Sequence, residues 1–320
     1  MNKPAQLSFV LLFVALLAVV WFHLGTLLLT SFFGYFALQL FSIRRSRIVG
    51  IVIYSLAVMV VGTGLLYFAS VAYRTFPSVA ETAIPAMVGF AEKHGFDLPF
   101  TDYASLKNSW LAEARAGIAI IGRYARIASV QTLLLGAGLT IALCVFLNPR
   151  WTAGKPAAAG TEDLFTQITG EFSLRFKNLF QSFATVMGAQ ILIAAINTAL
   201  TAIFLLSFGY PYSALLLCLV FLCGLIPIVG NLISNTVIVG VGFTISPETG
   251  LVALVFLVLI HKLEYFLDST IIGRRIHSPV WLMLIALLLG EILMGVPGMV
   301  LAPVLLHYIR SELSACPPLD

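Results

Sequence analysis

Long apolar windows follow one another along most of the chain, separated by short polar segments. Each window has about the length of the roughly 20 helical residues that cross a bilayer. The windows are continuous rather than alternating, which predicts helices and excludes a membrane β-barrel. We expect about six full spans, near residues 7–22, 26–43, 48–72, 128–147, 184–207 and 249–268.

Two further apolar stretches, residues 211–245 and 279–310, are each broken near the middle by proline and glycine. The first break is Ile226–Gly230 and the second is Gly295–Gly298. Each arm is about 11–15 residues long, which is too short for a span of roughly 20 residues. We therefore expect two re-entrant helical hairpins, and long kinked helices are the alternative.

The composition is that of a membrane protein. Of 320 residues, 60% are hydrophobic and 10% are charged, and the mean hydropathy is +1.02. A soluble protein has too little interior for so many apolar side chains, so we predict an all-α polytopic membrane protein. The net charge of +4 comes without a basic stripe interleaved with aromatic residues, and we expect no nucleic-acid partner. The four cysteines lack metal-ligand spacing and are interpreted as packing residues rather than a metal site.

Positive charge predicts the orientation. Arg44, Arg45 and Arg47 crowd one junction with no acid beside them, which indicates a cytoplasmic end. The N-terminus and the C-terminus are then cytoplasmic as well. If both broken stretches are hairpins, Arg274–Arg275 and Arg310 also fall on the cytoplasmic side. This favours hairpins over kinked spans and predicts an inverted repeat, in which each hairpin follows one full span.

These patterns divide the chain into four regions. They are an N-terminal three-helix membrane region (1–73), an external amphipathic helical segment (74–127), a region with the fourth span, a flexible linker and an interfacial helix (128–183), and a transport core with both hairpins (184–320).

The span 184–207 carries a polar stripe. Gln190, Asn197 and Thr201 are spaced 7 and 4 residues apart, which places them within about 20° of one helix face. Amides within a bilayer need partners, so the stripe faces protein or a water-filled cavity. It is either a polar wall for a hydroxylated solute or an ion, or a set of helix–helix hydrogen bonds.

The next span carries ionisable residues near its end. His261, Glu264 and Asp268 share one face, and ionisable groups within a span are candidates for function. A carboxyl group beside a histidine could relay protons. The alternative is that this part of the helix has already reached the cytoplasmic interface, where charges are tolerated.

The first hairpin tip combines a residue without a backbone donor, Pro227, with Gly230, which permits close backbone approach. Asn231 and Asn235 present amides just after the break. Freed carbonyls and half-helix ends at such a tip can coordinate a substrate or a cation. A break that is purely structural is the alternative.

The second hairpin tip contains Pro297 and Gly298, and Glu291 precedes it by one to two turns. An acid within an apolar hairpin needs a proton or a basic partner. We therefore treat Glu291 as a candidate for proton coupling, and structural pairing with a basic side chain as the alternative.

Several motifs of the C-terminal half resemble the bacterial AI-2E family of transporters, also called the autoinducer-2 exporter family. The matching segments are Gly224–Asn231, His261–Phe266, Ile272–Ile276, Ser278–Pro279, Gly290–Met299 and Leu301–Pro303. The resemblance implies a homo-oligomeric protein of the bacterial inner membrane that exports a small polar signalling molecule. Some members are similar to sodium/proton antiporters. Many members carry a Glu-Gly-Asn run where this chain has Glu264-Tyr265-Phe266.

The leading hypothesis is a secondary transporter that exports a small polar solute and is coupled to protons or sodium. Its site would lie between the polar stripe, both hairpin tips and the Glu264 helix. One alternative is a monovalent cation/proton antiporter, and another is a membrane scaffold or receptor that transports nothing. No catalytic motif or cofactor motif is present, so we expect neither an enzyme nor a cofactor.

Overall fold

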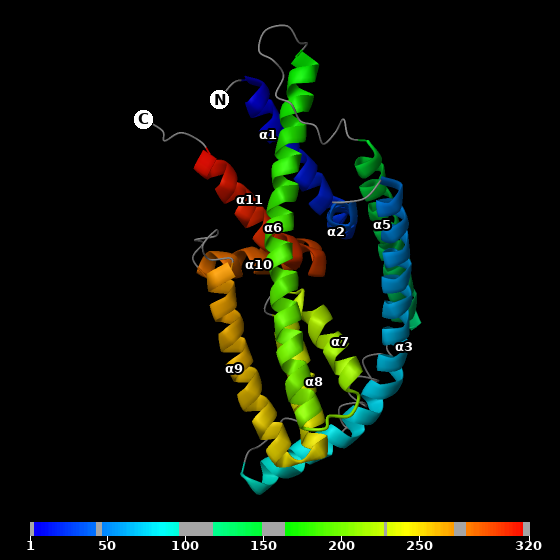
Figure 1. Ribbon diagram of the computed structural model, residues 1–320, viewed down its shortest axis with the longest axis vertical. Coiled ribbons are helices and arrows are strands. Elements are labelled where there is room, and N and C mark those ends of the chain that lie inside the picture. Colours follow the sequence, from blue (N-terminus) through cyan, green and yellow to red (C-terminus); the bar gives the residue numbers. More distant parts are fainter. Residues whose placement is uncertain are drawn as a thin grey trace. The chain divides into compact units, whose positions relative to one another are not determined.

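The computed structural model describes residues 3–42, 47–95, 118–148, 164–226, 229–271 and 280–315. Within these ranges the regular elements are α-helices, without a strand (Figure 1). In chain order they are α1 (Lys3–Trp21), α2 (Gly25–Ser42), α3 (Arg47–Lys93), α5 (Ile118–Leu147), α6 (Leu164–Ser207), α7 (Ser213–Gly224), α8 (Val229–Ile245), α9 (Pro247–Ile271), α10 (Val280–Met294) and α11 (Val296–Ala315).

Five of the described helices contain stretches long and apolar enough to cross a membrane. They are Pro4–Trp21, Gly25–Ser42, Ile48–Thr75, Ser129–Leu147 and Leu164–Ser207. The prediction of an all-α polytopic membrane protein is therefore confirmed. α9 is not among these five described stretches, and a full span there stays a prediction.

Two helices are longer than the sequence suggested. α6 joins the predicted interfacial helix and the predicted fifth span into one helix of 44 residues. The segment contains no proline, and single glycines at 170 and 188 do not end a helix. α3 continues past the third span to Lys93, so part of the predicted external segment belongs to this helix.

The chain forms two compact units, each built from several separate stretches. The first comprises Met1–Val58, Ala128–Gly188 and Ile276–Asp320, and the second comprises Met59–Ile127 and Ala189–Arg275. The α10–α11 hairpin belongs to the first unit, and α7, α8 and α9 belong to the second. The predicted four-region division stays a prediction.

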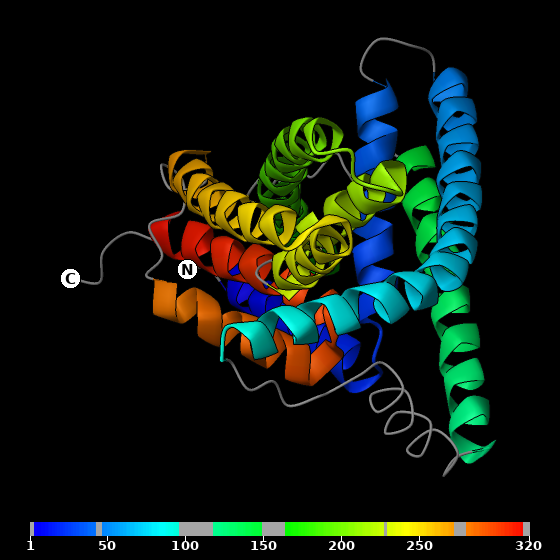
Figure 2. The same ribbon diagram turned by 90° about the horizontal axis from the view of Figure 1, so that it is seen from below.

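In the second unit, α7 and α8 form a helical hairpin, and α8 also packs along α9 (Figures 1 and 2). Leu216 of α7 and Ile238 of α8 lie in one buried cluster with Leu257 of α9. Phe204 of α6 stacks on Phe256 of α9, with ring centroids 4.2 Å apart and planes 7° from parallel. α7 has 12 residues, about 18 Å of helix, which is shorter than the roughly 30 Å hydrocarbon core.

In the first unit, α10 and α11 form the second hairpin, visible in orange and red in Figure 2. Aromatic contacts join α2 to α6, and the ring of Phe32 lies 5.1 Å from that of Phe183 between centroids. Leu38 and Tyr54 are buried with Ala142 of α5. Both predicted broken stretches are therefore helix–break–helix hairpins, while their entry from opposite sides of a membrane stays a prediction.

Candidate functional site

The first helix break, between α7 and α8, is closed by two contacts within the second unit. The Gln190 side-chain amide on α6 donates a 2.7 Å hydrogen bond to the backbone carbonyl of Gly224, the last residue of α7. Gly230 lies so close to the carbonyl of Cys223 that a Cβ at this position would overlap it. A glycine is therefore required here, and Gln190 satisfies a carbonyl freed by the break. Its contact is of the helix–helix type.

Asn231, at the start of α8, contacts Glu264 on α9. Its Nδ2 donates a hydrogen bond of 2.5 Å to Oε1 of the carboxylate. Asn231 is 6% exposed, and the Glu264 side chain is 12% exposed. A hydrogen bond to an ionised carboxylate is roughly twice as strong as one between neutral groups. The hairpin break is thus linked directly to the buried acid of α9.

Two amide oxygens of this region have no hydrogen-bond partner among the described residues. They are Oδ1 of Asn231 and Oδ1 of Asn197, and both are buried. Asn197 and Glu264 line the same small cavity, whose volume of about 10 Å³ is enough for about one water molecule. The remaining lining is apolar: Ile193, Ile196, Leu200, Ile260 and Leu263. Buried polar atoms without partners are rare, so they mark a place where a donor or a cation can bind.

The other predicted site residues of the second unit differ in their exposure and in their distance from the Asn231–Glu264 pair. His261 Nδ1 lies 3.7 Å from Glu264 Oε2, but the histidine side chain is 64% exposed. Thr201 is fully buried on α6, and Asn235 is half-buried on α8. Two predicted candidates, Pro227 and the side chain of Asp268, lie outside the described residues.

The second break, between α10 and α11, is also built on glycine. Gly295 adopts a left-handed conformation with φ of 66°, and its N–H donates to the carbonyl of Glu291 at 2.7 Å. Gly290 and Gly298 face each other so closely that a Cβ on either would overlap the carbonyl of the other. Pro297 packs against the start of α2. The sharp reversal therefore depends on the glycines that the sequence singled out.

Glu291 is exposed on α10. Among the described residues, no basic side chain forms an ion pair with Glu291. Its predicted structural alternative, pairing with a basic side chain, is thus not seen in the described part of the chain. The role of Glu291 in coupling stays a prediction, as does a single site shared by both hairpin tips.

The first unit contains a buried ionic cluster that the sequence did not reveal. Arg175 on α6 is 7% exposed; its Nε donates to Ser8 Oγ at 2.6 Å and its Nη1 pairs with Glu312 Oε2 at 3.2 Å. The guanidinium also lies 3.3 Å from the ring centroid of Phe9, and Asn178 donates to Glu312 at 3.0 Å. The cluster ties α1, α6 and α11 together. A single arginine on an aromatic helix face was the available clue, but its partners lie 137 and 167 residues away.

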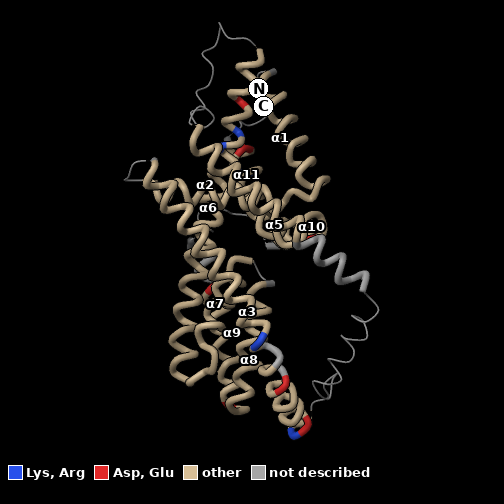
Figure 3. Tube along the Cα trace, turned by 90° about the vertical axis from the view of Figure 1, so that its right-hand side faces the viewer, with Lys and Arg blue, Asp and Glu red and all other residues tan. Residues whose placement is uncertain are grey.

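Apolar helices of membrane-spanning length, sparse charge along the described helices (Figure 3) and two hairpins broken at glycines are features of a polytopic α-helical membrane transporter. The sequence profile described as "AI-2E family transporter" matches residues 7–315. Because this match covers nearly the whole chain, the protein belongs to the AI-2E family. The resemblance seen in its motifs is confirmed.

A relative in Bacillus subtilis (strain 168), named "Putative transport protein YueF", is 30% identical over 129 residues. The match covers 40% of this chain and 35% of the relative. The chain therefore aligns with only about a third of that protein's length. No solved structure matches the chain.

Proposed function

We propose that the protein is a secondary transporter that exports a small polar solute and uses Glu264 to couple export to protons. The observation that supports this most is the hydrogen bond between Asn231 and Glu264. It joins the break of a helical hairpin to a largely buried acid, and broken helices are where secondary transporters bind substrates and coupling ions. Ionisable groups in membrane segments are expensive to bury and usually serve function.

Protonation of Glu264 changes the hydrogen bonds that it can form with the neighbouring amides. When Glu264 is ionised, it accepts the hydrogen bond of the Asn231 amide nitrogen. When it is protonated, its hydroxyl can instead donate to an amide oxygen, and Oδ1 of Asn231 and of Asn197 are the unpaired acceptors. Protonation therefore changes which amide groups are available to a polar solute. Gln190, by contrast, holds the break closed through the Gly224 carbonyl.

A monovalent cation/proton antiporter is the second candidate function. The unpaired oxygens of Asn197 and Asn231 and the carboxylate of Glu264 are the hard oxygen ligands that such cations bind. Release of a proton from Glu264 would add the negative charge that favours cation binding. In this version the small cavity beside Asn197 would hold the cation in place of water.

The proposal also covers the location, the orientation and the oligomeric state of the protein. The protein would lie in the cytoplasmic membrane of a bacterium, cross it several times, keep both termini in the cytoplasm and form a homo-oligomer. The arginine-rich junction Arg44–Arg47 supports this orientation. In the predicted inverted repeat, the hairpins would enter from opposite sides and expose the site alternately.

The proposal is tested by reconstituting the full chain in liposomes and measuring flux with and without a pH gradient. Solute flux that requires the gradient supports the exporter, and gradient-driven Na⁺ or K⁺ flux without solute supports the antiporter. No flux of any solute or ion from a correctly folded protein would favour a scaffold or receptor and contradict both transport candidates.

A further inference from the structure

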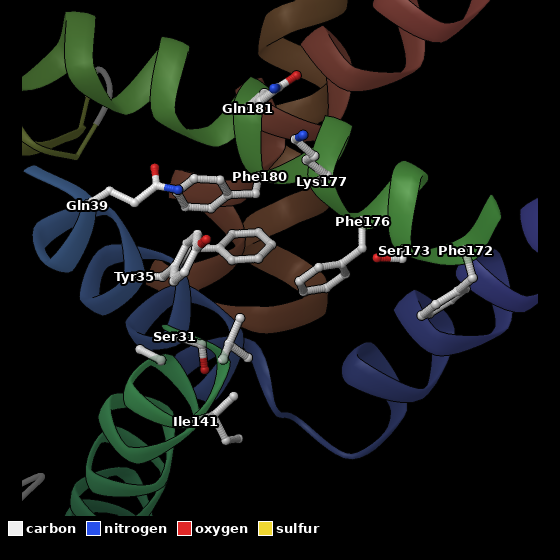
Figure 4. Close-up of a pocket in the computed structure, with 13 residues that line it drawn as sticks. Ser31, Tyr35, Gln39, Ile141, Phe172, Ser173, Phe176, Lys177, Phe180 and Gln181 are labelled. Atoms are coloured by element: carbon white, nitrogen blue, oxygen red, sulfur yellow. The ribbon is translucent and has the colours of Figure 1, made fainter. Parts of the chain in front are cut away.

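A second cavity, far larger than the one beside Glu264, lies in the first unit between α2, α5 and α6. Its volume is about 490 Å³, within the range of cavities that hold small-molecule ligands. None of the candidate transport residues lines it. Figure 4 shows rings of Tyr35, Phe176 and Phe180 gathered in this cavity, with Lys177 and Gln181 on α6.

The lining of this cavity has an apolar part and a polar part. Its apolar part consists mainly of aromatic rings, and Phe180 makes edge-to-face contacts with Tyr35 and with Phe32, with ring centroids 4.8 Å and 5.9 Å apart. Phe176 and Ile141 line the same cavity and are 38% and 41% exposed. An apolar chain could therefore enter the cavity from the side and pack against these rings.

The polar part of the lining is positive. Lys177 and Gln181 are four residues apart, which places them on one face of α6, and Gln39 of α2 supplies another amide. Of the thirteen described residues that line the cavity, none carries a carboxylate. Within the described residues, no acidic group forms an ion pair with Lys177. The side chain is thus available for an anion.

The predicted membrane topology places this cavity near the cytoplasmic leaflet. The cavity lies against the last turns of α5 and the second half of α2, both of which lead to the predicted cytoplasmic side. Anionic phospholipids of the cytoplasmic leaflet present a negative head group there, directly above their acyl chains. Basic pockets between membrane helices bind such head groups.

We propose that this cavity binds one anionic phospholipid, with the head group at Lys177 and the amides of Gln39 and Gln181. One acyl chain lies against Phe176, Phe180 and the rings beside them.

The test uses the purified full chain in detergent, titrated with phosphatidylglycerol or phosphatidylcholine, with bound lipid counted by native mass spectrometry. We expect one tightly retained phosphatidylglycerol and weaker retention of phosphatidylcholine. Lys177→Gln is expected to weaken phosphatidylglycerol binding about fivefold, the effect of one basic group near a lipid surface. Phosphatidylcholine binding should not change, and Lys93→Gln on α3 is the matched charge control.

A second pair of variants tests the apolar part of the site independently of charge. Ile141→Trp fills part of the cavity and should weaken binding of both lipids. Leu133→Trp, on the same helix at a position 73% exposed and outside the cavity, should leave binding unchanged. Equal retention of the two lipids, or lipid binding that neither Lys177→Gln nor Ile141→Trp changes, would overturn the proposal. Displacement of phosphatidylglycerol by soluble glycerol phosphate at equal concentration would instead indicate a site for small anions and also overturn it.

Discussion

The hydrogen bond between Asn231 and Glu264 predicts how one substitution changes proton-driven transport. Asn231→Leu keeps the approximate size of the side chain and removes the amide that donates to the carboxylate at 2.5 Å. A hydrogen bond to a charged group contributes about 1.5–3 kcal/mol, and about 1.4 kcal/mol corresponds to a tenfold change in rate. Because the helix break loses its direct link to the acid, proton-driven flux should fall about tenfold or more.

The assay is proteoliposome flux over a pH series, with folding checked by size-exclusion chromatography and by the thermal unfolding midpoint. Thr236→Val is the matched control, since Thr236 is exposed on α8 and its hydroxyl donates to the Leu232 carbonyl of its own helix at 2.8 Å. The control should keep the wild-type pH profile. A folded Asn231→Leu protein with the wild-type flux at every pH would refute the role of this hydrogen bond in proton-driven transport.

Three further predictions concern stability and local structure. Gly298→Ala should lower the thermal midpoint, because the new Cβ overlaps a carbonyl of α10 and overpacking costs about 1–3 kcal/mol; Gly136→Ala, with open space around it, should not. Arg175→Leu should destabilise the protein by about 3–5 kcal/mol in a denaturation series, because Glu312 is left without its ion pair, and a loss below 1 kcal/mol would contradict this. The pKa of Glu248 is lowered by hydrogen bonds to its own backbone N–H and to Ser246. Its contribution is therefore present above the usual carboxyl pKa and lost as the pH falls through the lowered value. The protection of backbone amides at the start of α9 against hydrogen exchange, taken relative to their intrinsic exchange rate at each pH, should therefore fall in acid for wild type but not for Glu248→Gln.

The sequence predicted both helix breaks and five long apolar helices that the structure contains, because these features depend on local properties. Apolar continuity defines a span wherever the chain is folded, and proline with glycine ends a helix through backbone geometry alone. The backbone of another residue approaches closely at Gly230, and Gly290 and Gly298 approach each other closely. This agrees with the prediction that glycine at the breaks permits close backbone approach. The length of α6 was underestimated, since its change from polar to apolar composition suggested two helices although no residue in it breaks one.

The contacts of the candidate site were less accessible to prediction. Helical periodicity aligned Gln190 with Asn197 on one face, but it could not show that the glutamine is used by the Gly224 carbonyl while the asparagine keeps an unpaired oxygen. The Asn231–Glu264 pair joins α8 to α9 through two residues that are 33 positions apart in sequence. Partner choice over such distances depends on how helices pack, and spacing carries no information about it. Arg175 was missed for the same reason.

The most direct test of the central claim is a measurement of proton movement by the full chain in liposomes that contain a pH-sensitive dye, with the membrane potential clamped. Glu264→Gln keeps the shape of the side chain and cannot bind or release a proton, while Glu248→Gln alters an exposed acid outside the site. Coupling through Glu264 predicts that Glu264→Gln abolishes substrate-dependent proton movement and that Glu248→Gln retains it. Proton movement at the wild-type rate in a folded Glu264→Gln protein would contradict the claim.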